Sequence, residues 1–291
     1  MTFIPAPLDR ARRIEVSNAT INVYDLGEVE ATPIVFLHGA GPGCTGWLDW
    51  HPVGERLGDA YRRIYVDLPQ YGDSSADPIE GPQYATYAGF VRELLDALEL
   101  GSAHFICQSY GGSVALRLAF DEPERFVSLT LTGTPAPYGV ISPSPLARVA
   151  GQVLAPYYDG GPTLEKLRTL IEQVEWVDPE AIPDGLVEAR FSKCSSPEHL
   201  ALREIKNVRG IPEDLGPDLG RNTVPTLLAY GDRDPFCPAE IPLNLFSRFP
   251  DARAIIFKNG SHHFPEELPE DYVTMVRPWL SECEARRKVP L

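Results

Sequence analysis

Residues 103–112, with the sequence Ala-His-Phe-Ile-Cys-Gln-Ser-Tyr-Gly-Gly, join a short apolar segment to a segment with helical spacing. The apolar run at 103–107 is typical of a buried strand, and 113–120 predicts a helix. A sharp turn from strand to helix strains its central residue and requires small neighbours, a need that Gly111 meets. The stretch therefore predicts that the Ser109 hydroxyl stands clear of the backbone at a helix N-terminus. The alternative is a serine that only caps an ordinary helix.

Strand and helix patterns alternate on both sides of this turn. Such alternation predicts a mostly parallel sheet with right-handed crossovers. Two segments near the N-terminus, 13–17 and 20–24, predict an antiparallel pair. The other expected strands are 33–37, 63–68, 103–107, 126–131, 224–230 and 254–257, and the expected helices are 84–100, 113–120 and 271–286.

The pattern changes in the middle of the chain. Residues 135–220 are rich in Pro and Gly and carry helical fragments, the clearest at 164–174 and 186–194. After this stretch the strand pattern returns, so we interpret 135–220 as a helical insertion. Residues 1–134 and 221–291 then form one core domain.

Composition excludes several classes of protein. Of 291 residues, 43% are hydrophobic and 23% charged, as in ordinary globular proteins. The 41 acidic and 26 basic residues give a net charge of −15, which disfavours nucleic-acid binding. Five widely spaced cysteines without a Cys-x-x-Cys pair indicate neither a disulfide framework nor a zinc site. The chain has neither an apolar run of about 18 residues nor a signal-peptide pattern, so we expect a cytoplasmic protein without membrane partners.

A glycine-rich loop follows the expected strand at 33–37. Its sequence, His38-Gly-Ala-Gly-Pro-Gly43, lets backbone N–H groups approach a ligand closely. One such N–H, from Ala40 or as second choice Gly41, would form an oxyanion hole with the N–H of Tyr110. The alternatives are a plain turn and a nucleotide loop, but the spacing is not Gly-x-Gly-x-x-Gly.

Two later loops carry the remaining candidate groups. The first holds Asp232 and Asp234 after the strand at 224–230, where a carboxylate could orient a histidine. The second holds His262 and His263, and one of them could act as general base for Ser109. No third ligand lies at a useful spacing from the two histidines, so we expect no metal. Serine, acid and then histidine is the order of the α/β-hydrolase arrangement.

Over nearly its full length the chain resembles the α/β-hydrolases. The resemblance implies an α/β fold with a mostly parallel eight-stranded sheet, flanked by helices, and a helical cap inserted after the sixth strand. The family's Gly-x-x-Asp motif selects Asp234 over Asp232, and no Asp or Glu occurs at 125–158, where some members place the acid. The family's histidine register selects His262 over His263. Residues 67–74 resemble the family's Asp-x-Pro turn, to which we assign no catalysis.

Within this family, the loop His-Gly-x-Gly-Pro-Gly resembles that of the hydrolases that act on meta-cleavage products of aromatic degradation. These enzymes split 2-hydroxy-6-oxo-dienoates into an acid and a 2-hydroxy-dienoate. The subfamily carries an Arg-Phe pair on a cap helix, which Arg190-Phe191 resembles. Arg190 is thus the candidate for binding the substrate carboxylate, since a guanidinium suits that group. The alternative is a helix arginine that faces solvent or pairs with Glu188.

Three residues depart from the subfamily pattern. Gln108 replaces an Asn that helps to handle the substrate enol, and His263 replaces a Trp, so both are candidates for substrate binding. Tyr110 replaces a Met. Its backbone N–H suffices for the oxyanion hole, and we expect its side chain to reshape the pocket.

The resemblance implies a serine hydrolase for a small-molecule substrate, without cofactor or metal, that could form a homo-oligomer. The Gln-Ser-x-Gly-Gly elbow also resembles proline iminopeptidases. A peptidase would need an acidic clamp for a free amine, for which Glu165, Glu172 or Glu175 could serve. A carboxylesterase and a non-catalytic ligand binder on the same fold are the remaining alternatives.

Overall fold

A single large sheet organises the computed structural model, which describes residues 3–135 and 145–288. The strand order is β1-β2-β4-β3-β7-β8-β10-β11, and the two-residue strand β5 pairs with β2. The predicted eight-stranded sheet is thus confirmed, with β5 as an addition at one side. The strands are β1 (Ala11–Val16), β2 (Ala19–Leu26), β3 (Thr32–Leu37), β4 (Tyr61–Val66), β5 (Ser75–Ala76), β7 (Ala103–Gln108), β8 (Phe126–Thr132), β10 (Thr226–Gly231) and β11 (Ala252–Phe257).

Strand directions follow the predicted pattern. Strand β2 is antiparallel to both β1 and β4. From β4 through β3, β7, β8 and β10 to β11, every pair is parallel. Because the carboxyl ends of parallel strands meet at one edge, the loops after β3, β7, β10 and β11 are brought together there.

Helices cover both faces of the sheet, as the alternation of side chains along β3 illustrates. Val35 and Leu37 belong to the core beneath one set of helices, and Ile34 and Phe36 to the core beneath the other. The first set comprises α2 (Gln83–Ala97), α3 (Ser109–Asp121) and α8 (Glu240–Arg248), and the second comprises α1 (Gly46–Leu57), the short α9 (Phe264–Glu267) and α10 (Pro269–Lys288).

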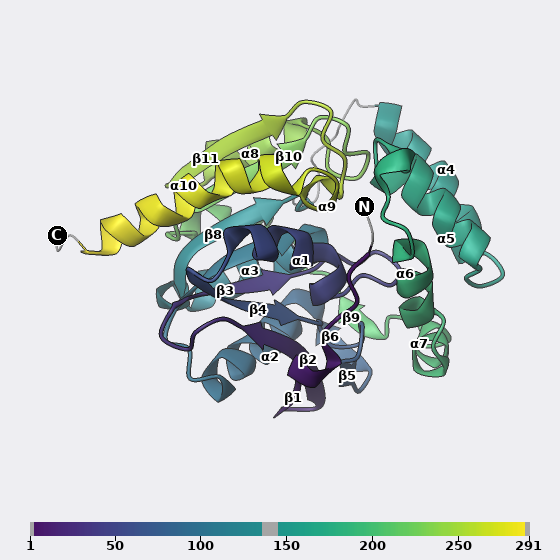
Figure 1. The fold of residues 1–291 in the computed structure, drawn as a ribbon, viewed down its shortest axis with the longest axis horizontal. Coiled ribbons are helices and arrows are strands. Elements are labelled where there is room, and N and C mark those ends of the chain that lie inside the picture. Colours follow the sequence, from purple (N-terminus) through teal and green to yellow (C-terminus); the bar gives the residue numbers. More distant parts are fainter. Residues whose placement is uncertain (1–2, 136–144, 289–291) are drawn as a thin grey trace.

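The helices of the predicted insertion lie together on one side of the molecule (Figure 1). A short parallel pair joins the returning chain to the segment before α2, through β6 (Ile79–Pro82) and β9 (Arg209–Ile211). The exact domain bounds at 135 and 220 remain predictions. These helices are α4 (Pro145–Tyr158), α5 (Leu164–Leu170), which continues as a π-helical turn (Ile171–Glu175), α6 (Leu186–Cys194) and α7 (Pro197–Arg203).

Two expectations from the sequence concern the cysteines and a membrane-spanning helix. All five cysteines are free and buried. Among the residues described, no helix is long and apolar enough to cross a membrane.

Candidate active site

The turn at Ser109 has the geometry that the sequence predicts. Strand β7 ends at Gln108 and α3 begins at Ser109, whose φ of 48° lies in the left-handed region that non-glycine residues rarely adopt. The N–H of Gly111 donates to the His38 carbonyl at 3.1 Å. A Cβ on Gly111 would lie 2.6 Å from that oxygen, so the glycine permits the loop after β3 to approach the turn.

The loop after β3 lies directly against the serine. A Cβ on Gly39 would be 3.5 Å from the Cβ of Ser109. The His38 ring fixes the start of the loop: Nδ1 lies 2.6 Å from the Gly39 carbonyl, and Nε2 accepts the N–H of Leu68 at 2.9 Å. Burial lowers the pKa of His38 to about 4, so the ring is neutral and its Nδ1–H donates to Gly39.

His262 and Asp234 meet beside this loop. Nδ1 of His262 lies 2.7 Å from Oδ2 of Asp234, while Oδ1 of Asp234 accepts two backbone N–H groups, each at 2.8 Å. Asp232 takes no part, because its carboxylate pairs with Lys258 and accepts the N–H of Asn259. Asp232 is therefore a turn-forming residue in this structure.

Gly133, after β8, is a site residue that the sequence analysis missed. Its φ is 50°, and a Cβ there would lie 2.9 Å from Nδ1 of His262 and 3.0 Å from Oδ2 of Asp234. Any side chain would therefore press on the contact between histidine and aspartate. A glycine two positions after the strand predicted at 126–131 was the available signal.

Ser109 and His262 line one cavity of about 210 Å³. Its wall also includes the loop residues Gly39, Ala40, Gly41 and Pro42, together with His263, Glu175, Leu154, Tyr158, Pro135, Phe236 and Cys237. The serine, the histidine and the predicted oxyanion loop therefore face a common space.

Two of the predicted substrate-pocket side chains lie elsewhere. The amide Nε2 of Gln108 donates to the backbone carbonyl of His262 at 2.7 Å, so Gln108 positions the histidine loop. The Tyr110 ring packs against Tyr71, Tyr84 and Tyr87 beneath the turn and is not part of the cavity wall. The expectation that the Tyr110 side chain reshapes the pocket is therefore wrong in this structure.

Arg190 is 1% exposed and lies behind the cavity wall. Its guanidinium pairs with both carboxylate oxygens of Glu175, at 3.2 Å from Nη2 to Oε1 and closer from Nη1 to Oε2. Nε donates to the Pro42 carbonyl at 3.1 Å, and Nη2 lies 3.4 Å from the Cys44 sulfur. The alternative partner, Glu188, pairs with Arg168 instead. The sequence did not identify Glu175 as the partner of Arg190. It suggested Glu175 only as a possible acidic clamp for a free amine.

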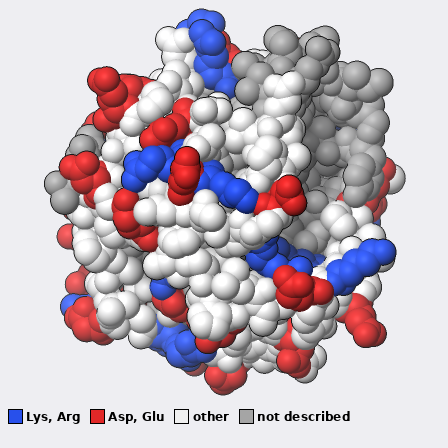
Figure 2. All heavy atoms as spheres, turned by 90° about the vertical axis from the view of Figure 1, so that its right-hand side faces the viewer, with Lys and Arg blue, Asp and Glu red and all other residues white. Residues whose placement is uncertain are grey.

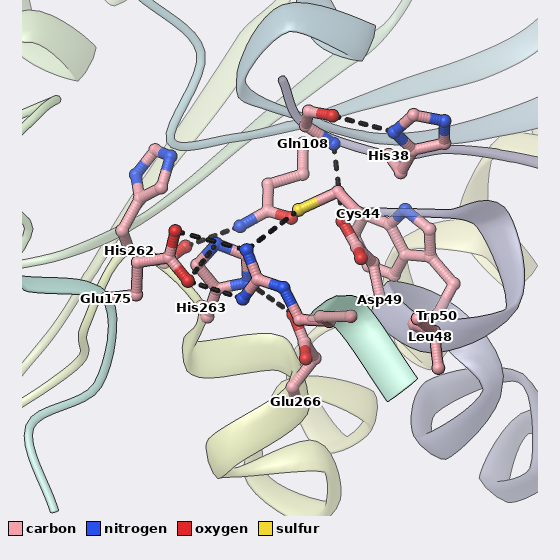
Figure 3. A network of polar contacts seen from close by, with 12 residues as sticks. His38, Cys44, Leu48, Asp49, Trp50, Gln108, Glu175, His262, His263 and Glu266 are labelled. Atoms are coloured by element: carbon pink, nitrogen blue, oxygen red, sulfur yellow. Dashed lines mark hydrogen bonds and ion pairs between the residues drawn. The ribbon is translucent and has the colours of Figure 1, made fainter. Parts of the chain in front are cut away.

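His263 belongs to the same polar network, which Figure 3 shows. Its Nδ1 is hydrogen-bonded to Oε1 of Glu266, and its Nε2 lies 3.6 Å from Oε2 of Glu175. Asp49 adds a further buried carboxylate that accepts the N–H of Gly39 at 3.3 Å. Three acidic groups and Arg190 thus surround His263, which is 2% exposed.

Burial and charge shift the pKa values of this network in opposite directions. Burial raises the pKa of Glu266 well above its usual range and that of Asp49 to about 7. Burial would also raise the pKa of Glu175, but Arg190 and His263 beside it bring that pKa below its usual value. Burial lowers the pKa of His263. Arg190 therefore favours the ionised form of Glu175, whereas burial favours the protonated form of Glu266.

Among the residues that the structure describes, two groups of side chains are close enough to hold a metal ion. They are Asp234 with Cys237 and His262, and Asp49 with His263 and Glu266, with ligand atoms within 4.8 Å of one another in each group. In both groups the histidine is already hydrogen-bonded to a carboxylate, and burial raises the pKa of the Cys237 thiol. We therefore assign neither group as a metal site.

Residues 34–275 match the model of the alpha/beta hydrolase family. The chain belongs to this family and is a hydrolase whose class uses a serine nucleophile. The alternative of a non-catalytic ligand binder is set aside.

Its relatives include meta-cleavage product hydrolases. The chain is 31% identical to 2-hydroxy-6-oxo-6-phenylhexa-2,4-dienoate hydrolase of Burkholderia cepacia, over 85% of this chain and 86% of the relative. It is 30% identical to 2-hydroxy-6-oxononadienedioate/2-hydroxy-6-oxononatrienedioate hydrolase of Paraburkholderia xenovorans (strain LB400), over 92% and 94% of the two chains. The resemblance to this subfamily is thereby confirmed.

A solved structure shows the same fold. The meta-cleavage product hydrolase CumD from Pseudomonas fluorescens IP01 superposes with a TM-score of 0.80 at 21% identity, covering 94% of this chain and 99% of that one.

Proposed function

We propose that the protein cleaves a carbon–carbon bond of a 2-hydroxy-6-oxo-dienoate, with Ser109 as nucleophile, His262 as general base and Asp234 as the acid that orients the histidine. The observation that carries this proposal is the common cavity lined by Ser109, His262 and the Gly39–Pro42 loop. The hydrogen bond from His262 to Asp234 supports the assignment of acid and base. The relatives named for this reaction support the choice of substrate.

The reaction needs a proton transfer before the bond can break. We propose that His262 moves a proton from the dienol oxygen to carbon, which gives a ketone able to accept the leaving electron pair. Ser109 then attacks the distal carbonyl as His262 removes its proton. The oxyanion lies against the N–H groups of Ala40 and Tyr110, with Gly41 as the second choice of loop donor. The carbon–carbon bond breaks with its electron pair moving onto the ketone, and His262 returns its proton to this enolate to release the 2-hydroxy-dienoate. Water, activated by His262, then hydrolyses the acyl-enzyme to the acid and frees Ser109.

Hydrolysis of an ester of a small acidic substrate is the second candidate. Ester hydrolysis uses the same acyl-transfer steps but omits the proton transfer to carbon. We keep this candidate because the cavity has His263 where the subfamily usually has Trp. An aminopeptidase is less well supported. Glu175 lines the cavity but pairs with Arg190, while Glu165 is exposed and Glu172 pairs with Arg168.

Loss of the visible absorbance of a yellow 2-hydroxy-6-oxo-6-phenylhexa-2,4-dienoate tests the proposal. We expect rapid decay with the wild-type enzyme and none with Ser109→Ala or His262→Ala, each of which should keep its thermal unfolding temperature. Decay that persists in Ser109→Ala would contradict the nucleophile assignment. No decay with the wild type, together with turnover of p-nitrophenyl esters that depends on Ser109, would favour the second candidate.

A further inference from the structure

The guanidinium of Arg190 is already bound to a carboxylate that belongs to the protein. Glu175 contacts both Nη atoms, Pro42 accepts from Nε, and the two side chains are 1% and 3% exposed. Glu175 lines the cavity at Ser109, whereas Arg190 does not. An anionic group entering the cavity therefore meets the carboxylate before it can reach the arginine.

We propose that Glu175 is the residue that controls substrate specificity: it occupies the anion site of Arg190 as an internal carboxylate, and a substrate carboxylate binds there by displacing it with uptake of one proton. This inference rests on the proposed function, in which the substrate is an acid. It adds that Glu175 competes with that acid, so neutral groups enter the wild-type cavity more readily than anionic ones.

The position of the ion pair relates it directly to the reacting groups. A Cβ on Gly41 would lie 3.0 Å from Nη2 of Arg190 and 3.2 Å from Oε1 of Glu175, so the pair lies against the oxyanion loop. A carboxylate held by Arg190 would therefore lie beside that loop, inside the space shared with Ser109. Exchange of one carboxylate for another at this point is a change within the catalytic cavity.

The local backbone allows a change that is confined to the side chain. Glu175 is the last residue of the π-helical turn Ile171–Glu175, a type of irregularity that is frequent at functional sites. Its backbone carbonyl accepts the N–H of His263 at 3.2 Å, which holds the main chain in place. Only the carboxylate has to swing away from Arg190 for the exchange to occur.

Charge balance requires a proton when the exchange takes place. Once Arg190 binds the substrate, Glu175 is left as a buried charge without its counter-ion, which is strongly unfavourable. Protonation of Glu175 or of His263, 3.6 Å away, removes this cost. Several titratable and charged groups face Glu175. They are Arg190 from α6, Tyr158 from α4, His262, His263 and Glu266 from the loop before α9 and its start, and Cys44 from the loop before α1.

Calorimetric binding of benzoate, with benzamide as the neutral isostere, tests the exchange without turnover. In the wild type we expect benzoate to bind with uptake of close to one proton, detected in buffers of different ionisation enthalpy, and to bind up to about tenfold more weakly per unit rise in pH. Glu175→Gln should bind benzoate roughly tenfold more tightly without proton uptake. Benzamide should bind both proteins equally. Equal affinity of both proteins for benzoate, or no benzoate binding by either, would overturn the proposal.

A second measurement covers the possibility that Glu175→Gln is unstable, since it leaves Arg190 without its counter-ion. Saturating benzoate should raise the thermal unfolding temperature of Glu175→Gln more than that of the wild type, because the ligand replaces the missing carboxylate. The double variant Glu175→Gln/Arg190→Met, with no charge to neutralise, should show no such rise. A similar rise in the double variant would place the benzoate elsewhere and overturn the proposal.

The two proposals fail separately. If the dienoate is not turned over but Glu175→Gln gains affinity for benzoate, only the assigned reaction is wrong. If the dienoate is turned over and Glu175→Gln gains no affinity for benzoate, only the internal-carboxylate inference is wrong.

Discussion

The contact between His262 and Asp234 predicts a sharp difference between two aspartates that are two positions apart. Asp234→Asn removes the charge that holds the imidazole in its working tautomer, so we expect kcat to fall by roughly 10³–10⁴. Asp232→Asn, at the exposed contact with Lys258, is the matched control and should change kcat less than about threefold. Steady-state kinetics on the dienoate or on an ester would measure both. A larger loss in the Asp232 variant would contradict the assignment of the acid.

His38 makes stability depend on pH in a defined direction. Its pKa is about 4 in the folded protein against 6.5 as the ordinary value, so the unfolded chain binds the proton more readily between these pH values. The folded state is therefore destabilised as the pH falls from about 6.5 to 4, by up to about 3 kcal/mol. Denaturant unfolding of the wild type and His38→Asn should show that the difference in stability between them narrows on acidification. A constant difference would mean that His38 does not carry this dependence.

Among single residues, local sequence motifs were enough to select the candidate serine, acid and histidine. Ser109 is marked by the strand-to-helix turn, and Asp234 and His262 by the loops after two strands. The partner of Arg190 could not be predicted in this way, because Glu175 lies 15 positions away on a separate helical turn. A buried guanidinium needs an acidic partner, so a carboxylate near Arg190 could be expected, but the sequence does not identify which residue supplies it.

Among the elements, the contact between α6 and the oxyanion loop predicts the effect of a single methyl group. Gly43 has a φ of 74°, and a Cβ there would lie 2.6 Å from the carbonyl carbon of Arg190. Gly58 has a φ of 76° with nothing within 4 Å of its Cβ position. Because Gly58 has a ψ of −169°, in a region that only glycine adopts readily, Gly58→Ala should lose only this backbone cost, about 1–3 kcal/mol.

Gly43→Ala also places a side chain at a positive φ and adds a clash with the Arg190 backbone. We expect it to lose at least ~1 kcal/mol more than Gly58→Ala, as overpacking commonly does, and to lower kcat/KM because the loop or α6 must move. If Gly43→Ala and Gly58→Ala lost equal stability and Gly43→Ala kept its kcat/KM, the contact between α6 and the loop would not affect the active site.

Element prediction failed where tertiary contacts override local preference. Helix α1 contains Pro52 and Gly54, residues that disfavour a helix interior, and it was not predicted. It forms because Thr45 caps its N-terminus and because Trp50, which is fully buried, packs in the core beneath it. Neither contact can be recognised from the local pattern, whereas the central strands were predicted because their runs are buried on both faces.

For the whole molecule, the net charge of −15 predicts how salt affects an anionic substrate. Figure 2 shows acidic and basic side chains interspersed on the face that it draws, with uncharged areas between them, so the repulsion is diffuse. Salt screens such fields over about 8 Å at physiological ionic strength. We expect kcat/KM for a dienoate to rise modestly, about twofold to threefold, with added sodium chloride, and that for a neutral ester to stay constant. A fall for the dienoate would indicate attraction that the net charge does not suggest.

The five buried cysteines can report which part of the molecule unfolds first. Cys107 lies in the central strand β7, whereas Cys194 lies on α6 and is 9% exposed. Burial raises the pKa of both thiols, so an alkylating reagent would react with each only after its surroundings open. Pulsed alkylation in rising denaturant, read by mass spectrometry, would therefore show whether α6 detaches before the sheet unfolds or whether both are lost in one cooperative step.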